Sequence, residues 1–462
     1  MKSEDYCIKL NFRIRALKLK IRKDIKISYI YLLKWILLAL LAGAVGSLTV
    51  HSFFFLLSNI TKFFLSYPVP PPAYAVFGAV VSGGLIYRLQ PNASGEGIPS
   101  YIQGLRDYGG ELSPSVTLFK YFAGLATLST FGNGGIVGPV GRVSAGIMSL
   151  IAGRLQKLGL NRDDIHTAAI CGMAATVGAV FHTPIGGGIF AVEIIQRRKL
   201  GYKDLFPAIL SSSTAVFLAR TFHVRSFYRI QVPGDIMDVR MIGWLAGLSV
   251  LLGLAGALYA QLYVYVSKLI KREKGKTLVK VVSGSLVASS IAWLINPELL
   301  GTSTRFIQSI ITGDMAVLSG RLPGIIPIGW VLLIMLIGKA VCNCITVGSG
   351  MSAGFTGPAA IIGMLLGGSV AFFLRLDQTS PTFFAFIAAG FSGMLASSMN
   401  IPLASSVMAI EIFGLEYSIP AALAAIIGFQ INRHMTIYDF AKAGSGKGQQ
   451  EPPLQEFGPF LS

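Results

Sequence analysis

The sequence predicts an all-α integral membrane protein, and its composition, its apolar runs and an internal repeat support this prediction. Apolar residues make up 53% of the 462 residues and charged residues only 13%, about half of the usual ~25%. The mean hydropathy is +0.64. A soluble protein of this size could not bury so much apolar surface, and a disordered chain would not carry it.

The charges and the cysteines exclude other classes of protein. The net charge is +18, which in a soluble protein would suggest a nucleic-acid partner. In a membrane protein, Lys and Arg collect in cytoplasmic loops beside an anionic leaflet, so we expect a lipid bilayer and no nucleic acid as partner. The four cysteines and five histidines have neither disulfide nor metal-ligand spacing, so we expect reduced thiols, no metal and no cofactor.

Residues 1–28 are predicted to form a basic cytoplasmic N-terminal segment. Nine Lys or Arg and three acids lie in Met1–Ile30, and the apolar run that follows is too long for a cleavable signal peptide. The segment is either a solvated tail or a lipid-binding helix. We expect a multi-pass protein of the cell (inner) membrane with its N-terminus in the cytoplasm.

Residues 29–222 are predicted to form a first membrane repeat. The apolar run Tyr29–Leu65 is longer than a ~30 Å hydrocarbon core requires, so its helix must tilt or leave the membrane. The run Ala73–Leu89 follows, and later runs are short and begin at Gly or Pro. Broken helices at membrane depth are tolerated where they are buried or line a polar cavity, which is typical of transporters and channels.

The remaining segments complete the predicted organisation. Residues 223–240 form a connecting loop and residues 241–442 a second membrane repeat. Residues 443–462 form a polar tail that is too short to hold a regulatory domain.

Two motifs of the first repeat recur in the second at nearly the same offset. Such weak repeats with matching Gly/Pro-interrupted helices are typical of transporters whose binding site lies at the repeat interface. The matching pairs are Gly172–Pro184 with Gly390–Pro402, Glu193 with Glu411, and Gly135–Pro139 with Gly354–Pro358, at offsets of 218 or 219 residues.

The Gly/Pro motifs predict three helix starts suited to an anion. Pro is harmless in the first turn of a helix, where its missing N–H has no partner. The neighbouring glycines leave the first amides uncovered, and a helix N-terminus carries about half a positive charge. Helices that start near Pro99, Pro139 and Pro358 could therefore converge on one dehydrated anion.

At these residues the sequence resembles the CLC family of chloride channels and proton-coupled chloride transporters, from about Leu32 to Tyr438. The three family signatures match Gly95–Pro99, Gly135–Pro139 and the stretch Gly348–Pro358. The resemblance implies a CLC-like inverted-repeat fold with many tilted and broken helices, a homodimer, and chloride or another small anion as substrate. It assigns the pathway to Glu96, Gly97, Ile98, Val137, Gly138, Phe355, Thr356 and Tyr438.

The departures from the family pattern fall on functional positions. The family has a gating, proton-shuttling glutamate in its second signature, and here that residue is Val137. Its inner proton-path glutamate is matched by Ile194. Neither side chain titrates, so the resemblance implies passive, channel-like conduction rather than family-type proton coupling.

Glu96 stands where the family usually has a serine whose hydroxyl donates to the central anion. An ionised carboxylate only accepts hydrogen bonds and would repel chloride. Three interpretations stay open. Glu96 is protonated by burial and donates as serine does, it occupies the anion site as a relocated gate, or it turns away as a helix cap. Val137 is the second gating candidate because of its position.

Other residues keep two interpretations each. Thr356 either lines the pore or has exchanged register with Phe355, since the family has Phe there. Tyr438 either donates to the anion or anchors the chain at the membrane interface. Glu193 and Glu411 are repeat mates, which favours a shared structural role such as capping backbone or pairing with Arg over a functional one.

The sequence therefore predicts anion transport, with no catalytic residues. No Ser/His/Asp, HExxH or Walker pattern accompanies the intramembrane acids, so an enzyme is not expected. The alternative is an anion/proton antiporter that uses Glu96. Fluoride, nitrate or bicarbonate could replace chloride as the physiological anion.

Overall fold

The computed structural model describes residues 2–195, 201–222, 239–272, 277–303, 306, 308–309, 317 and 320–439. Throughout these ranges the secondary structure is helical apart from turns, loops and one isolated bridge. The predicted all-α fold is therefore confirmed. The predicted tail 443–462 and nearly all of the predicted loop 223–240 lie outside the described residues.

Eight helices among the described residues are long and apolar enough to cross a membrane. The helices of the first half are α1 (Lys2–Leu65), α2 (Pro71–Gly84), α3 (Ile98–Asp107), α4 (Pro114–Ser129), α5 (Val137–Leu155), α6 (Arg162–Phe181), α7 (Pro184–Glu193) and α8 (Tyr202–Thr221). Those of the second half are α9 (Val239–Arg272), α10 (Thr277–Ile295), α13 (Ile328–Gly348), α14 (Thr356–Phe373), α15 (Pro381–Met399), α16 (Pro402–Phe413) and α17 (Ser418–Asn432). Short π or 3-10 turns are η1 (Leu85–Leu89), η2 (Pro91–Ala93), η3 (Gln156–Leu158), η4 (Pro297–Leu299) and η5 (Leu415–Tyr417).

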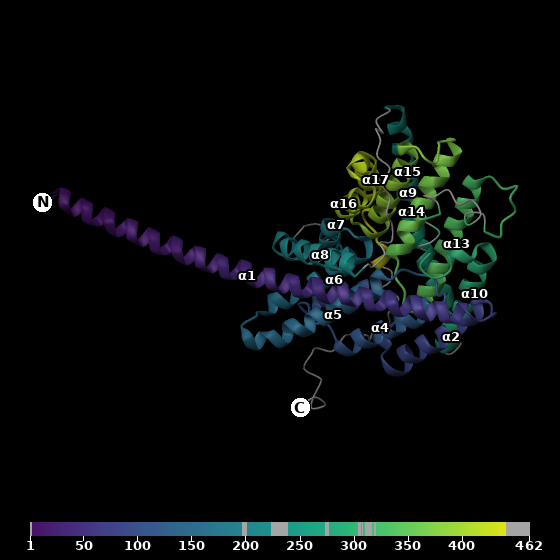
Figure 1. Cartoon of the computed structure of the whole chain (residues 1–462), viewed down its shortest axis with the longest axis horizontal. Helices are drawn as coiled ribbons and strands as arrows, with labels where there is room; N and C mark the ends of the chain where they lie inside the picture. The colour runs from purple at the N-terminus through teal and green to yellow at the C-terminus, as the bar shows by residue number, and fades with distance from the viewer. Residues whose placement is uncertain are drawn as a thin grey trace.

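The long helix α1 crosses the molecule. Its C-terminal part packs against α8, α6 and α5, while its N-terminal part extends far from the other helices (Figure 1, purple). One continuous helix thus contains both the predicted basic segment and the first predicted span. In the same view α2, α4 and α5 lie on one side of α1 and α14 to α17 on the other (Figure 1).

Repeat-related positions end and start helices in the same way in both halves. α6 ends at His182 (φ 58°) and α15 at Asn400 (φ 57°), two non-glycine residues in the left-handed conformation that stops a helix. Two residues later Pro184 and Pro402 begin α7 and α16, where proline is favoured. α6 and α15 are also the most deeply buried of the span candidates, so the repeat positions the centre of the molecule.

Two carboxylates exchange caps between the halves. Glu193, at the end of α7, accepts hydrogen bonds from the amides of Leu403 (3.1 Å) and Ala404 (2.7 Å) at the start of α16. Glu411, on α16, accepts bonds of 2.8 Å each from the amides of Ile185 and Gly186 at the start of α7. Each acid satisfies amides that a helix start leaves unpaired. Such reciprocal contacts are what a two-fold relation between the halves produces.

Candidate anion-binding site

Three helix N-termini meet at the centre of the molecule. α3, α5 and α14 begin at Ile98, Val137 and Thr356. The residues before α5 and α14 pair in an antiparallel bridge, in which Gly135 N–H donates to Gly354 O at 2.9 Å and Gly354 N–H to Gly135 O at 2.7 Å. The two repeat-related signatures therefore contact each other directly.

Glycine brings the third helix start into contact with the other two. Gly97 has φ +113°, a conformation that L residues rarely adopt. A Cβ at Gly97 would lie 2.5 Å from the carbonyl oxygen of Gly138, near the start of α5. Only a residue without a side chain allows the loop before α3 to lie against α5 in this way.

The carboxylate of Glu96 lies among these three helix starts. Its side chain is almost completely buried, with 3% of the residue exposed. Oε2 accepts a hydrogen bond of 2.6 Å from Ile98 N–H, and Oε1 accepts one of 3.3 Å from Phe355 N–H. A Cβ at Gly138 would lie 2.3 Å from Oε1. Glu96 thus accepts from the starts of α3 and α14 and packs against that of α5.

Opposing effects act on the charge of Glu96, which is in the loop before α3 and outside the helices that could span the membrane. Burial disfavours the charged form and raises the pKa of Glu96 to about 7. The amides of Ile98 and Phe355 and the charge of Lys120 favour the carboxylate and lower the pKa. Glu96 therefore changes protonation state near neutral pH.

Lys120 is a residue of the site that sequence reasoning did not identify. From α4, its buried ammonium donates to the carbonyl oxygens of Ala93 (3.0 Å), Ser94 (3.0 Å) and Gly95 (2.5 Å). It thereby holds the loop that carries Glu96.

The second half has a matching lysine. Lys339 on α13 donates to Leu299 O (3.3 Å), Gly301 O (3.0 Å) and Ser303 Oγ (2.7 Å). Lys120 and Lys339 are 219 residues apart, and this agreement with the repeat offset is the signal that could have revealed both.

Tyr438 and Thr356 lie beside the same helix starts. The Tyr438 hydroxyl is 3.4 Å from Thr356 Oγ1 and donates to Met399 Sδ at 3.2 Å. Both residues are buried. The Phe355 ring packs edge-on against Tyr263, with 4.8 Å between ring centroids. The structure thus places the Thr356 hydroxyl toward Tyr438 and the Phe355 ring toward α9.

The two positions at which the family has glutamates are apolar and buried. Val137 opens α5 and is 1% exposed, and Ile194 follows α7 and is 6% exposed. Ile194, Glu193 and Tyr438 line one cavity of about 20 Å³, which has room for a single water. The structure therefore brings the predicted residues Glu96, Gly97, Ile98, Val137, Gly138, Phe355, Thr356 and Tyr438 into one region and puts Ile194 beside Tyr438.

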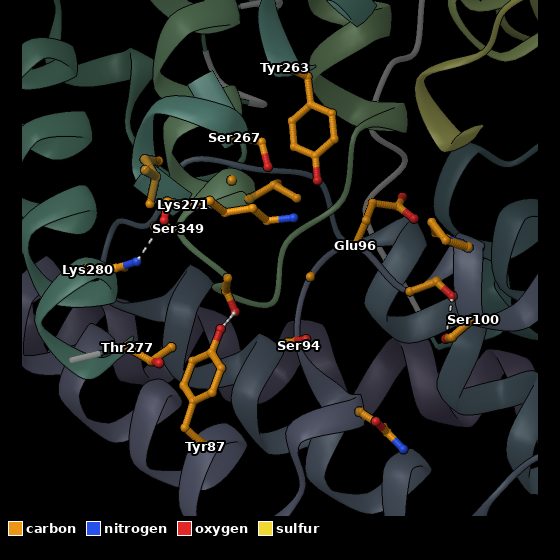
Figure 2. Close-up of a pocket in the computed structure, with 18 of the residues that line it drawn as sticks. Tyr87, Ser94, Glu96, Ser100, Tyr263, Ser267, Lys271, Thr277, Lys280 and Ser349 are labelled. Carbon is orange, nitrogen blue, oxygen red and sulfur yellow. Dashed lines mark hydrogen bonds between the residues drawn. The ribbon is translucent and has the colours of Figure 1, made fainter. Parts of the chain in front are cut away.

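A larger cavity of about 310 Å³ has Glu96 among its lining residues (Figure 2). The loop before α3, the end of α9, the start of α10 and residues 347–350 line it. Polar side chains dominate, including the hydroxyls of Ser94, Ser267 and Thr277. Among the described residues, no group of three or more His, Cys, Asp or Glu is arranged to hold a metal ion.

Broken helices that converge on a buried polar centre define a multi-pass membrane transport protein. Comparison with known proteins gives the family. Residues 78–433 match the family model described as voltage gated chloride channel, so the chain belongs to this family, the CLC family, whose members are channels and transporters rather than enzymes.

Individual relatives and solved structures agree with this assignment. The chain is 26% identical over 426 residues to an uncharacterized protein of Methanocaldococcus jannaschii (90% of this chain, 97% of that protein). It is 27% identical over 297 residues to a chloride/fluoride channel protein of Pseudomonas syringae pv. tomato (64% and 62%). The crystal structure of a CLC-type fluoride/proton antiporter has the same fold, with a TM-score of 0.76 at 20% identity (89% and 98% of the chains). The predicted resemblance and the CLC-like fold are confirmed.

Proposed function

We propose that the protein conducts small anions, chloride first among them, passively across the cell membrane, and that the Glu96 carboxylate is its gate. The observation that carries this proposal is the position of Glu96. Its two oxygens accept from Ile98 and Phe355 amides, which belong to two helix starts of the kind that bind anions.

A charged Glu96 and a bound anion would compete for the same amides. Helix N-termini stabilise a negative charge without a buried full positive charge. While the carboxylate occupies them, an anion cannot, and at contact distance the two negative charges repel each other. Entry of an anion then requires that Glu96 be protonated or displaced.

The absence of titratable groups at two positions supports passive transport. Val137 and Ile194 stand where the family's proton path uses glutamates. Neither can accept or release a proton, so a proton would find no carboxylate at either end of that path. Glu96 alone is at the centre and provides gating without a second relay.

Anion/proton antiport through Glu96 is the second candidate. Its support is the protonation of Glu96 near neutral pH and the relatives of this type, which include an H(+)/Cl(-) exchange transporter of Vibrio cholerae that is 24% identical over 349 residues. A chloride/fluoride channel protein among the relatives makes fluoride the second substrate candidate.

Reconstituted vesicles separate these functions. Chloride-loaded vesicles with a potassium ionophore should release chloride while the external pH stays constant. Uphill proton movement in a fixed ratio to chloride would establish antiport instead. Release of chloride, fluoride, nitrate and bicarbonate, compared at equal concentrations, identifies the preferred anion. Vesicles with purified protein that release none of these anions would refute anion transport.

We also propose that the protein is a homodimer with a cytoplasmic N-terminus. The exposed residues Ile185 (47%) and Leu403 (45%) are repeat mates at the starts of α7 and α16. Burial of such apolar side chains against a second copy would be favourable. A detergent-corrected mass of one chain in light scattering would exclude the dimer, and protease access from the periplasmic side to the first 28 residues would exclude the orientation.

A further inference from the structure

The cavity that reaches Glu96 contains two lysines from different helices. Lys271 is in the last turn of α9, and Lys280 is in the first turn of α10. Both line the cavity, and among its described lining residues they are the only cations and Glu96 is the only acid. Lys280 Nζ is 3.4 Å from the backbone oxygen of Lys271 and donates to it, so the two helix ends lie together at this wall.

Donor groups follow one face of α9 into the cavity. Tyr263, Ser267 and Lys271 are four residues apart and all line the cavity, as residues on one helix face do. Tyr263 packs against Phe355, whose amide binds Glu96. Lys271 lies two turns away, about 12 Å along the helix. Figure 2 shows its side chain within the cavity, on the side where Ser267 and Tyr263 lie.

The positive charge of this wall is more specific than a general cytoplasmic excess of lysine. Lys268 and Arg272 are on the same end of α9 and are exposed, but neither lines the cavity. A charge distribution that served only membrane orientation would not distinguish these positions from Lys271.

From this arrangement we infer that Lys271 and Lys280 form an anion-recruitment site, which concentrates small anions in the cavity before they reach Glu96. The inference rests on the proposed anion transport. In water, an anion about 5 Å from one ammonium is enriched about fourfold. The enrichment falls with salt, because the Debye length shortens from ~30 Å at ~0.01 M to ~3 Å at ~1 M.

A charge series at Lys271 tests the inference. We expect Lys271→Gln to reduce chloride efflux about fourfold at ~10 mM salt and Lys271→Glu to reduce it about tenfold or more. Lys271→Arg should retain wild-type efflux. At ~1 M salt all these variants should lie within about twofold of wild type. Lys280→Gln should behave as Lys271→Gln does.

Lys268→Glu is the matched control, since it changes the same charge on the same helix end outside the cavity. An equal loss in Lys268→Glu and Lys271→Glu would overturn the inference, because general surface charge would explain both. A loss in Lys271→Gln that is the same at low and high salt would also overturn it and indicate a packing role. A wild-type protein without anion flux would refute the proposed function itself.

Discussion

Replacement of Glu96 tests the gate most directly. The pKa of Glu96 is about 7, so about nine-tenths of the side chains are protonated at pH 6 and about one-tenth at pH 8. If only the protonated form admits an anion, wild-type flux should fall about tenfold between these pH values. The direction follows from the sign of the charge, because deprotonation produces the carboxylate that competes with the anion.

Two substitutions remove this charge in different ways. Glu96→Gln keeps the shape of the side chain without the negative charge. Glu96→Ser shortens it and leaves the amides of Ile98 and Phe355 open to an anion. Both variants should conduct at pH 8 about as fast as wild type does at pH 6, a gain of about tenfold over wild type at pH 8. Their flux should not change between pH 6 and pH 8.

Chloride efflux from vesicles, measured with an ion-selective electrode at equal internal and external pH, gives the profile. Glu416→Gln is the control, since Glu416 is exposed in η5 and should keep the wild-type profile. If both Glu96 variants retain the flux and the pH profile of wild type, Glu96 only caps helices and the gating argument is wrong.

Three further predictions concern proton coupling, the outer position and the exchanged caps. Because Val137 and Ile194 cannot titrate, a chloride gradient should move no protons, and net acidification or alkalinisation that tracks chloride in a pH-electrode assay would contradict this. Val137→Glu should slow chloride efflux and make it more dependent on pH, whereas Val137→Gln should not add pH dependence; an unchanged profile in Val137→Glu would place residue 137 away from the pathway. Glu193→Gln removes the charge that accepts from Leu403 and Ala404, so it should lower the free energy of unfolding by about 1.5–3 kcal/mol, visible as a lower melting temperature in detergent; a melting temperature equal to that of wild type would show that these bonds contribute little.

The helix starts could be predicted from sequence because their signals are local. Pro99, Pro139 and Pro358 lie one to two residues inside α3, α5 and α14, as proline in a first helical turn does. The repeat was visible for the same reason, since each motif is a short run of residues. The resemblance to the CLC family then placed Glu96 and Tyr438 near these starts.

Partners distant in sequence could not be predicted. The sequence indicated a structural role for Glu193 and Glu411, but not that each caps the helix which carries the other acid. Their partners lie 210 to 226 residues away, and only the packing of the halves selects them. Lys120 resembled any lysine of an apolar run, since the carbonyls of residues 93–95 that it binds have no side-chain signature.

The exchange of caps between Glu193 and Glu411 has a consequence for biosynthesis. The amide of Ala404 follows Glu193 by 211 residues, a delay of about 10 to 40 s at ~5–20 residues per second. During this interval α7 has been made, but its own N-terminal amides lack Glu411, which is still to be translated. The newly made first half must therefore wait in the translocon or beside a chaperone with a carboxylate and a helix end unsatisfied, and the arrival of α16 completes both at once. Premature termination before Glu411 would leave a product that quality control can recognise by these exposed polar groups.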